Sequence, residues 1–341
     1  MRAIVIRTPG EPDVLELREL PDPEPPFGFV RVAVRFAGVN RADVLQRKGF
    51  YPAPPGAPKD IPGLEYAGVV EVLGPGASRF TVGDRVHGVV AGGGYADKLV
   101  VHEHETAPVP DGMSDEDAAA VPEAFITAFD ALVVRGRMQA GDHVLIHAAG
   151  SGVGTAGVQI AARLGAIPIG TSRTRDKLDR CKELGLAHGI VADKGQFADA
   201  VKAQSGGRGA DVVLDLVGGA YVAEDLRAVA SGARIVVVGL TGGARADLDL
   251  AMLLSKRVEI VGTVLRSRPL AEKIEAALLL ERRLGPLFAS GASSRPAALR
   301  AVVDEVLPLE RAADAHRRLE KSDTFGKILL SCARGGGSRA G

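Results

Sequence analysis

The feature that most constrains the fold is a glycine-rich turn between a strand-like and a helix-like segment, in the run VLIHAAGSGVGTAGVQIAARLG at residues 144–165. The apolar run before the turn is typical of a buried parallel strand, and the segment after it has helical character. Glycines let a backbone approach a pyrophosphate, and the N-terminus of the following helix supplies N–H donors and the positive end of a dipole. In this context the turn predicts a dinucleotide-binding site. A turn that only packs the helix on the strand is the alternative.

Two registers of this turn fit the residues. Gly152, Gly154 and Gly157 form a literal GxGxxG pattern. The end of the strand favours instead Ala149, Ser151 and Gly154 as the three positions, and we prefer this register because the turn should begin where the strand stops. The residues expected to contact the cofactor here are Gly150, Ser151, Gly152, Val153 and Gly154.

The residues after the next strand bear on which dinucleotide is bound. Sites for NAD usually place an acidic side chain there to bind the ribose 2′-hydroxyl. This chain has instead hydroxyl and cationic side chains, at Thr171, Ser172, Arg173 and Lys177. Such groups suit a 2′-phosphate, so the sequence predicts NADPH over NADH. A solvated basic turn without a ligand is the alternative.

Two kinds of pattern divide the chain. Up to about residue 122, short β-type runs alternate with turns rich in Gly and Pro, as in a compact all-β domain. From about Asp115, helices and strands alternate, beginning with a helical stretch to residue 133 that has Ser114 as its N-cap. This alternation predicts an α/β fold with a doubly wound parallel sheet. The strand-like run GKILLSCA, residues 326–333, is expected to return to the β-rich domain and make it discontinuous.

Length and composition narrow the function classes. The 341 residues suggest two domains at roughly 150 residues each. The 42 basic and 42 acidic residues leave no net charge, which argues against nucleic acid as a main partner. The two cysteines, Cys181 and Cys332, are consistent with a reducing compartment. Because no secretory signal or membrane-spanning run is visible, we expect a cytoplasmic protein without a membrane partner.

Several further motifs give the chain a resemblance to a known family. They look like those of the quinone oxidoreductase, or zeta-crystallin-like, branch of the medium-chain dehydrogenase/reductase superfamily. The matching segments are GVNRADVLQRKGFYPAPPG (38–56), PGLEYAGVVEVLGPGASRFTVGDRV (62–86), GGGYADKLVV (92–101), the glycine-rich block, GTVLRSRP (262–269) and PLERAADAHRRLEKSDTFGKILL (308–330). The resemblance therefore extends nearly from end to end.

The resemblance implies a domain organisation and an assembly. It implies a GroES-like, β-rich catalytic domain formed by residues 1–122 and 270–341, and a Rossmann domain for NADPH at residues 123–269. Members of the family are typically NADPH-dependent homo-oligomers, commonly dimers. A homodimer is therefore expected.

Zinc has to be considered, because alcohol dehydrogenases of this superfamily use it. A catalytic zinc site needs thiolate and imidazole ligands, and the first cysteine of this chain is Cys181. By resemblance, Asn40 and Leu64 stand where the zinc enzymes carry Cys and His, and the lobe with four cysteines is missing. His102 and His104 would share one face of a strand, but two histidines without a third ligand are typical of a surface pair. No metal site is therefore expected.

Without a metal, reduction depends on placing a hydride donor against an acceptor and on donors for the reduced oxygen. By resemblance, Tyr51, Asn40 and Asp43 are the expected catalytic residues, in the segment that forms the floor and mouth of the active site. Tyr51 can donate a proton or a hydrogen bond to a developing quinolate. A loop anchor is the alternative for Tyr51, and a helix-turn hydrogen bond is the alternative for Asp43. Some relatives carry a second tyrosine where this chain has Leu45, which argues against a two-tyrosine mechanism.

Further cofactor contacts follow from the resemblance. Thr127 is expected to face the nicotinamide, and Asn40 belongs to the cofactor contacts as well. The remaining candidates follow later strands or lie in the C-terminal return: Gly239, Leu240, Thr241, Gly242, Thr263, Val264, Leu265, Phe325 and Lys327. Packing is the alternative for each, although the place of Gly239 at a strand end favours close approach to a ligand.

The expected function is hydride transfer from NADPH to a quinone or a related conjugated carbonyl, without zinc. Reduction of an activated C=C bond, as in an enone or enoyl thioester with Tyr51 as proton donor, is the first alternative. A non-catalytic NADPH-binding protein with a structural or regulatory role is the second. The same site and cofactor would serve the two reductions, so the sequence separates them poorly. The intact glycine-rich turn and the presence of Tyr51 argue against the non-catalytic role.

Overall fold

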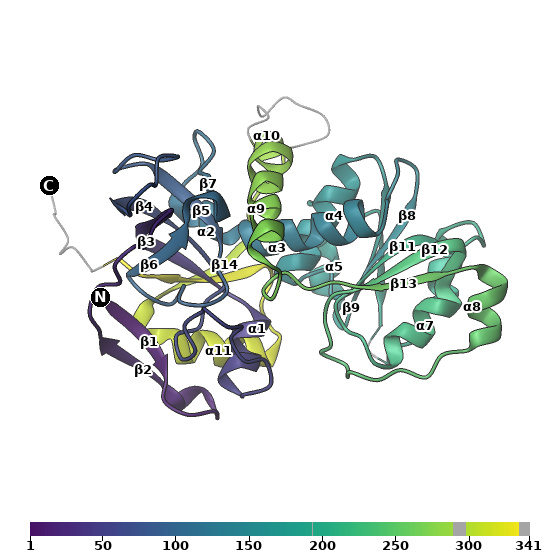
Figure 1. Cartoon of the computed structure of the whole chain (residues 1–341). Helices are drawn as coiled ribbons and strands as arrows, with labels where there is room; N and C mark the ends of the chain where they lie inside the picture. The colour runs from purple at the N-terminus through teal and green to yellow at the C-terminus, as the bar shows by residue number, and fades with distance from the viewer. Residues whose placement is uncertain (193, 289–297, 334–341) are drawn as a thin grey trace, which may run out of the picture. The chain divides into compact units, whose positions relative to one another are not determined.

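The computed structural model describes residues 1–192, 194–288 and 298–333 (Figure 1). Contacts within the chain divide it into two compact units. Unit 1 contains residues 1–123, 265–288 and 300–333, and unit 2 contains residues 124–264 and 298–299. Among the described residues, no helix is both long and apolar enough to cross a membrane.

Unit 1 is built on a seven-stranded sheet in the order β14-β15-β3-β4-β5-β7, with β6 paired to β3. Its pairs are antiparallel except that of β14 with β15. The strands are β3 (Phe29–Val39), β4 (Glu65–Leu73), β5 (Arg85–Val89), β6 (Lys98–His102), β7 (Thr106–Pro108), β14 (Val303–Pro308) and β15 (Lys327–Ser331). A separate hairpin pairs β1 (Arg2–Ile6) with β2 (Leu15–Glu19).

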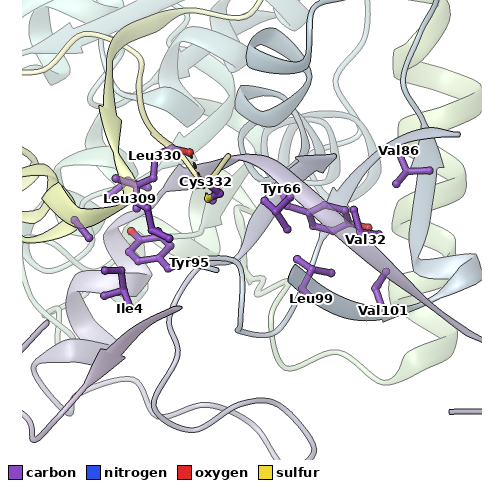
Figure 2. Packing of buried hydrophobic residues seen from close by; sticks show 14 of the residues in the cluster. Ile4, Val32, Tyr66, Val86, Tyr95, Leu99, Val101, Leu309, Leu330 and Cys332 are labelled. Carbon is purple, nitrogen blue, oxygen red and sulfur yellow. Dashed lines mark hydrogen bonds between the residues drawn. The ribbon is translucent and has the colours of Figure 1, made fainter. Parts of the chain in front are cut away.

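The two ends of the chain share the core of unit 1. Strand β15 pairs with β3, so that Leu330 lies opposite Ala37. Figure 2 shows the result, with Leu309 and Cys332 from the C-terminal part packed in one cluster with Ile4 and Tyr95. The predicted return of the last strand to the β-rich domain is therefore confirmed.

Helices and short turns connect the strands of unit 1. They are η1 (Pro12–Val14), α1 (Arg41–Arg47), η2 (Glu103–Glu105), α2 (Asp115–Ala120), α9 (Leu270–Leu279), the π-helical η4 (Leu280–Leu284), α10 (Gly285–Phe288), η5 (Leu309–Arg311) and α11 (Ala312–Lys321). Ser114 caps α2, as predicted, and its side chain accepts a hydrogen bond from the Asp117 N–H.

The single helical stretch expected up to residue 133 is broken in the structure. Helix α2 ends at Ala120, and α3 (Pro122–Phe129) and the π-helical η3 (Asp130–Arg135) follow. Pro122 explains the break, because proline lacks the N–H that would continue the helical hydrogen bonds and it restricts the residue before it.

Unit 2 is a six-stranded parallel sheet in the order β10-β9-β8-β11-β12-β13. Counted along the chain, this is the order 3-2-1-4-5-6 of a doubly wound Rossmann fold, so the predicted fold class is confirmed. The strands are β8 (His143–Ile146), β9 (Ile167–Ser172), β10 (His188–Val191), β11 (Ala210–Asp215), β12 (Val229–Val237) and β13 (Glu259–Gly262). The helices are α4 (Gly152–Arg163), α5 (Arg175–Lys182), α6 (Ala198–Gln204), α7 (Ala220–Ala228) and α8 (Leu250–Lys256).

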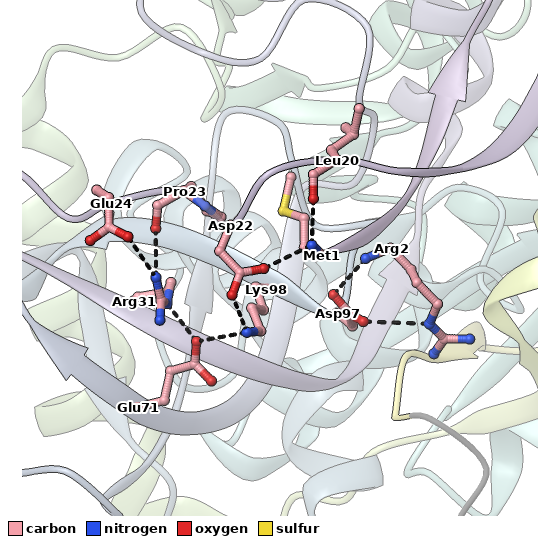
Figure 3. Close-up of polar contacts among 10 residues, drawn as sticks. All are labelled: Met1, Arg2, Leu20, Asp22, Pro23, Glu24, Arg31, Glu71, Asp97 and Lys98. Carbon is pink, nitrogen blue, oxygen red and sulfur yellow. Dashed lines mark hydrogen bonds and ion pairs between the residues drawn. The ribbon is translucent and has the colours of Figure 1, made fainter.

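Partly exposed ion pairs join strands of unit 1 near the N-terminus (Figure 3). Lys98 on β6 pairs with Asp22, and its ammonium also lies 3.6 Å from the Glu71 carboxylate on β4. Arg31 on β3 pairs with Glu71 as well. Water and salt screen pairs of this kind, so each adds little to stability.

Candidate functional site

The glycine-rich turn of unit 2 starts directly after β8 ends at Ile146. Ala148 takes a left-handed conformation with φ 48°. Ser151 caps α4, and its hydroxyl accepts a hydrogen bond from the Gly154 N–H at 3.1 Å. A Cβ atom on Gly154 would lie 2.3 Å from the Ala148 carbonyl oxygen, so this position needs glycine. Gly154 belongs to both registers considered from the sequence, so the preference for Ala149, Ser151 and Gly154 stays a prediction.

The turn has the properties that a dinucleotide phosphate requires. The N–H groups of the first turn of α4, among them those of Gly152 and Val153, have no partner within the helix and carry the positive end of its dipole. A Cβ atom on Gly150 would lie 3.0 Å from Cβ of Lys177, so the stem of this basic side chain packs directly against the turn. An anion at this end of the sheet would therefore meet both N–H donors and a cation.

The residues at the end of β9 have different roles from one another. Thr171 is buried, and its hydroxyl lies 2.8 Å from Nδ1 of His147. Its hydroxyl is thus used by a neighbouring side chain, and a contact between Thr171 and the cofactor stays a prediction. Ser172 is half-buried and accepts a hydrogen bond from the Thr174 N–H, while Arg173 is exposed. Ser172, Arg173 and Lys177 remain as candidates for a 2′-phosphate site.

A buried polar cluster that sequence reasoning missed joins the ends of neighbouring strands. Nε2 of His147 lies 2.7 Å from the Asp225 carboxylate, and both residues are fully buried. The Asp215 carboxylate accepts hydrogen bonds from the N–H groups of Val217 and Gly218. Burial raises the pKa of Asp225 to about 6, although His147 acts in the opposite direction.

The donor atoms of His147, Asp215 and Asp225 lie within 4.8 Å of one another. In the part of the chain that the structure describes, the second oxygen of each carboxylate has no hydrogen-bond partner. Both nitrogens of His147 are engaged, by Thr171 and by Asp225. We therefore assign the cluster a structural role, in which its hydrogen bonds hold the ends of β8, β9 and β11 in place.

The segment after β12 packs against the turn that follows β11. A Cβ atom on Gly239 would lie 2.5 Å from the Leu216 carbonyl oxygen, and one on Gly242 would lie 2.8 Å from the Val217 side chain. The Thr241 hydroxyl donates to the same Leu216 oxygen, while Leu240 is exposed. Two glycines of this turn that sequence reasoning missed, Gly218 and Gly219, have positive φ angles of 68° and 57°. Consecutive glycines after a strand were the available signal.

The remaining candidates of unit 2 lie on α3 and after β13. Thr127 is half-buried on α3. The Thr263 hydroxyl donates to the Asp130 carboxylate at 2.8 Å, and Val264 is exposed. Leu265, the first residue of the returning segment of unit 1, is buried.

In unit 1, Asp43 takes part in a capping box with Asn40 at the N-terminus of α1. Its carboxylate accepts hydrogen bonds from the Asn40 N–H at 2.8 Å, the Gly63 N–H at 3.1 Å and the Tyr95 hydroxyl at 3.1 Å. Asp43 is fully buried, and this burial raises its pKa to about 6. These contacts match the alternative stated for Asp43, a helix-turn hydrogen bond, and its catalytic role stays a prediction.

A chain of hydrogen bonds runs from Asp43 through the Tyr95 hydroxyl to His316 and Arg47. The Tyr95 hydroxyl lies 3.1 Å from Nε2 of His316 on α11, and Nδ1 of His316 lies 3.4 Å from the Arg47 guanidinium. Since Arg47 can only donate, Nδ1 is the acceptor and Nε2 carries the proton. Burial, followed by the charge of Arg47, lowers the pKa of His316 to about 3, so the ring is neutral.

The Asn40 side chain is held by a buried ion pair. Its amide nitrogen donates to Glu65 at 3.0 Å, and its oxygen accepts from the Lys327 ammonium at 2.6 Å. Lys327 lies 2.5 Å from Glu65 and also donates to the Val39 carbonyl. Glu65 is fully buried and Lys327 is 5% exposed. A Cβ atom on Gly38 would lie 2.1 Å from the Glu65 carboxylate, so glycine makes room for it.

The C-terminal candidates therefore have partners within unit 1. The ammonium of Lys327, expected to contact the cofactor, is used by Glu65, Asn40 and a backbone carbonyl. Phe325 is buried, and its N–H donates to the Asp304 carboxylate. The structure thus places Lys327 in support of Asn40, a role that the sequence did not indicate.

Glu123 lies beside this ion pair and was not identified from the sequence. Its N–H donates to Glu65 at 2.8 Å. Burial, and then the charge of Glu65, raise the pKa of Glu123 to about 8, so this carboxyl group keeps its proton at neutral pH. The cluster thus places the Glu123 carboxyl group, whose pKa is raised, next to the Glu65–Lys327 ion pair.

Tyr51 lies in the loop after α1 and is half-buried. Its N–H donates to the Leu45 carbonyl, and its ring lies under the Arg266 guanidinium, with 5.2 Å between Cζ and the ring centroid. Within the described residues the structure records no hydrogen bond to the Tyr51 hydroxyl, which leaves this group available to a ligand. Leu45 is 37% exposed.

His102 and His104 have the contacts of a surface pair. The two rings are 5.6 Å apart, and the His102 side chain accepts a hydrogen bond from the His104 N–H. The Arg79 guanidinium lies 3.3 Å from Nδ1 of His104. A fixed positive charge at this distance opposes the binding of a metal cation.

Comparisons with known proteins place these features in a family. An alcohol dehydrogenase GroES-like domain matches residues 27–111, and a zinc-binding dehydrogenase family matches residues 152–281. Rat quinone oxidoreductase is 31% identical over 97% of both chains. The polyketide synthase GfsB of Streptomyces halstedii is 36% identical over 96% of this chain, but the match covers only 6% of that protein.

Solved structures lead to the same family. A crystal structure of an NAD-dependent alcohol dehydrogenase has a TM-score of 0.83 and 34% identity, and the match covers 98% of this chain and all of that one. Escherichia coli quinone oxidoreductase, crystallised with NADPH, has a TM-score of 0.83 and 27% identity over 97% of this chain and all of that one. The chain is therefore an oxidoreductase that belongs to the medium-chain dehydrogenase/reductase superfamily, with a GroES-like domain and a Rossmann domain.

Proposed function

We propose that the protein reduces quinones, or related conjugated carbonyls, with NADPH and without a metal. The observation that carries the proposal is Tyr51: its hydroxyl has no hydrogen-bond partner among the described residues, and its ring lies under the Arg266 guanidinium. Where zinc enzymes of the superfamily would offer Cys and His ligands, this chain has Asn40 and the core residue Leu64. Asn40 is held by Glu65 and Lys327, an arrangement that offers hydrogen bonds and no thiolate or imidazole.

The cofactor would be held mainly by backbone groups of unit 2. When bound, NADPH supplies the hydride from its nicotinamide ring. The turn at residues 150–154 and the N-terminus of α4 would bind the pyrophosphate, and Ser172, Arg173 and Lys177 would bind the 2′-phosphate. The further contacts that we propose are Asn40, Thr127, Gly239, Leu240, Thr241, Gly242, Thr263, Val264 and Leu265.

The protein's own contribution to the reaction is a proton donor, Tyr51, held next to the acceptor. As the acceptor takes up the hydride, negative charge develops on its carbonyl oxygen. The O–H bond of Tyr51 would break, its proton would pass to that oxygen, and the phenolate would regain a proton from water. A donor aimed at developing charge in a water-poor site lowers the barrier, because it needs no reorganisation at the moment of reaction.

We also propose the assignment of the two domains and the assembly. Residues 1–122 and 270–341 would form the catalytic domain and residues 123–269 the NADPH-binding domain. The two units have nearby limits at residues 123 and 265, although residues 298–299 belong to unit 2. The family supports a cytoplasmic homodimer. Sedimentation of the purified chain would test the dimer directly.

The first experiment measures oxidation of NADPH with a panel of quinones, in parallel with NADH and after treatment with a chelator. We expect turnover that survives the chelator and prefers NADPH. Loss of activity on chelation, with recovery on adding zinc, would contradict the metal-free mechanism. Equal kcat/KM for the two cofactors would contradict the choice of NADPH. NADH is the alternative, because one similar structure is that of an NAD-dependent alcohol dehydrogenase.

Charge reversal tests the 2′-phosphate site itself. Arg173→Glu and Lys177→Glu should each raise the KM for NADPH by about tenfold or more, the effect of losing one charge-assisted hydrogen bond, with little effect on NADH. Lys182→Glu is the matched control, because Lys182 lies on α5 with Lys177 but its side chain is 62% exposed and pairs with Asp179. Equal losses with both cofactors would show that these residues do not read the 2′-phosphate.

Reduction of an activated C=C bond is the second candidate function. It is favoured by the 36% identity with a segment of a polyketide synthase, which exceeds the identity with rat quinone oxidoreductase. A preference of about a hundredfold in kcat/KM for α,β-unsaturated carbonyls over quinones, equivalent to about 2.7 kcal/mol, would establish it. Saturable NADPH binding without turnover of any acceptor would instead indicate a non-catalytic role.

A further inference from the structure

Arg266 is a buried cation that forms no ion pair with an acidic side chain in the part of the chain that the structure describes. Arg266 is only 5% exposed. Its Nε donates to the Ala91 carbonyl at 2.8 Å, one terminal nitrogen donates to the Tyr51 carbonyl at 3.1 Å, and the other donates to the Gln46 side chain at 2.6 Å. No carboxylate lies within ion-pair distance of it among residues 1–192, 194–288 and 298–333. A buried charge without a counter-ion is costly, and such costs are concentrated at functional sites.

The partners of Arg266 come from separate segments of unit 1. Gln46 belongs to α1, Tyr51 to the loop that follows α1, and Ala91 to the turn after β5. Gln46 also donates to the Lys59 carbonyl at 3.1 Å, farther along the same loop. One guanidinium thus fixes the Tyr51 backbone directly and the rest of the loop through Gln46. The fixed fork of arginine suits this role better than a lysine ammonium would.

The same guanidinium lies over the Tyr51 ring. The distance of 5.2 Å from Cζ to the ring centroid is within the range of a cation–π interaction. A positive charge so close to the ring favours the phenolate over the phenol, and the effect is larger where water is scarce. Burial raises the pKa of Tyr51, and the charge of Arg266 acts against that rise.

We propose that Arg266 is the positioning and electrostatic partner of Tyr51, holding its loop in place and stabilising the negative charge left on its oxygen when the proton is donated. The proposal rests on the proposed function, in which Tyr51 is the proton donor. The step needs no further reactant: the electron pair of the O–H bond stays on Tyr51, the proton goes to the acceptor, and water restores it. For a C=C acceptor the same proton would go to carbon.

Other charged groups act on this pair. Glu123 raises the pKa of Tyr51, and both Asp43 and Glu123 favour the charged form of Arg266. Because the pKa of Glu123 is about 8, its opposing negative charge develops mainly above neutral pH. The contribution of Arg266 must therefore be measured over a pH range and not at one pH.

The experiment is a pH profile of kcat at saturating NADPH and quinone. Because a general acid must be protonated, kcat falls as pH rises through its pKa. Arg266→Met should lower the plateau of kcat by about tenfold to a hundredfold and move the alkaline fall to higher pH. Arg266→Lys keeps the charge but not the fork, so it should retain the position of the fall while raising KM for the quinone. Dissociation constants for NADPH should not change.

Three further variants keep the test decisive. Gln46→Glu places a carboxylate opposite Arg266 while keeping the shape of the site, and it should shift the profile in the same direction as Arg266→Met even if the latter folds poorly. Arg282→Met is the control, since Arg282 is exposed on η4. Tyr51→Phe separates the two proposals: if it leaves kcat unchanged, the proposed function is wrong.

If Tyr51→Phe lowers kcat but Arg266→Met and Gln46→Glu leave the pH profile of kcat unchanged, the role of Arg266 is refuted while the proposed function stands. If the proposal holds, the double variant Tyr51→Phe with Arg266→Met should be little slower than Tyr51→Phe alone. Additive losses in the double variant would show that Arg266 acts independently of Tyr51.

Discussion

The cofactor turn of unit 2 and the Asn40–Tyr51 region of unit 1 are built in opposite ways. The turn consists of consecutive residues, and its geometry depends on backbone conformation and on the absence of a side chain at Gly154. The Asn40 side chain depends on Glu65 and on Lys327, which lies 287 residues along the chain. An added methyl group in the turn should thus weaken cofactor binding, and the loss of one charge near Asn40 should lower the free energy of unfolding.

The largest expected effect is on the buried ion pair of unit 1. Lys327→Met leaves the Glu65 carboxylate buried without its counter-charge, so the free energy of unfolding should fall by about 3–5 kcal/mol. Urea denaturation would measure the loss. Lys327→Met combined with Glu65→Gln should recover part of it, because no uncompensated charge remains.

The matched control for that variant is Lys98→Met, which removes a partly exposed ammonium from the ion pairs of Figure 3. Its effect should be much smaller, because solvent screens the pair. A loss as large as that of Lys327→Met would contradict the distinction between the buried pair and the surface pair.

The next largest effect concerns the turn of unit 2. Gly154→Ala forces the Ala148 carbonyl to move, since the added Cβ would lie 2.3 Å from it. The dissociation constant for NADPH should rise by about a hundredfold, or about 2.7 kcal/mol, as measured by the fluorescence of the bound cofactor. Gly262→Ala on β13 is the control, because a Cβ there meets nothing within 4 Å and its φ is not positive. Unchanged binding in Gly154→Ala would contradict a backbone-built site.

The last predicted effect is a pH dependence of stability in unit 1, which is measured as a slope and not as a loss at one pH. The pKa of Glu123 rises from 4.5 to about 8 on folding, so the folded state holds a proton that the unfolded state releases. The resulting stability is complete below about pH 4.5 and is lost as pH rises through 8. Glu123→Gln should flatten this fall by at most about 1.4 kcal/mol per pH unit.

Unfolding of Glu123→Gln by urea at several pH values between 5 and 9 would measure that slope. Glu19→Gln, which changes an exposed acid, is the control. If the variant and the unmodified protein lose stability in parallel over this range, the proton is not held by Glu123.

The parts that sequence reasoning predicted well depend on neighbouring residues. The glycine-rich turn, the Ser114 cap and the return of the last strand each follow from short patterns. The break at Pro122 was missed although proline carried its signal, because the apolar pattern continues through it.

The contacts that sequence reasoning missed are those between distant segments. Arg266 and Gln46 are 220 residues apart, and no local pattern indicates that they meet. Asp43 and Thr171 lie at their expected places in the chain, but burial and hydrogen bonds to Tyr95 and His147 direct their side chains inward. Spacing in the sequence predicts where a residue lies, and packing decides what its side chain contacts.

By itself, the sequence determined the two kinds of domain and the turn that suits a dinucleotide, because strand and helix patterns and the need for glycine act over a few neighbouring residues. Only the tertiary structure decided that Lys327 supports Asn40, that Glu123 keeps a proton and that Arg266 lies over Tyr51. These roles arise from burial and from charges brought together by folding, and the free energy of a charge depends on its surroundings more than on its neighbours in the chain.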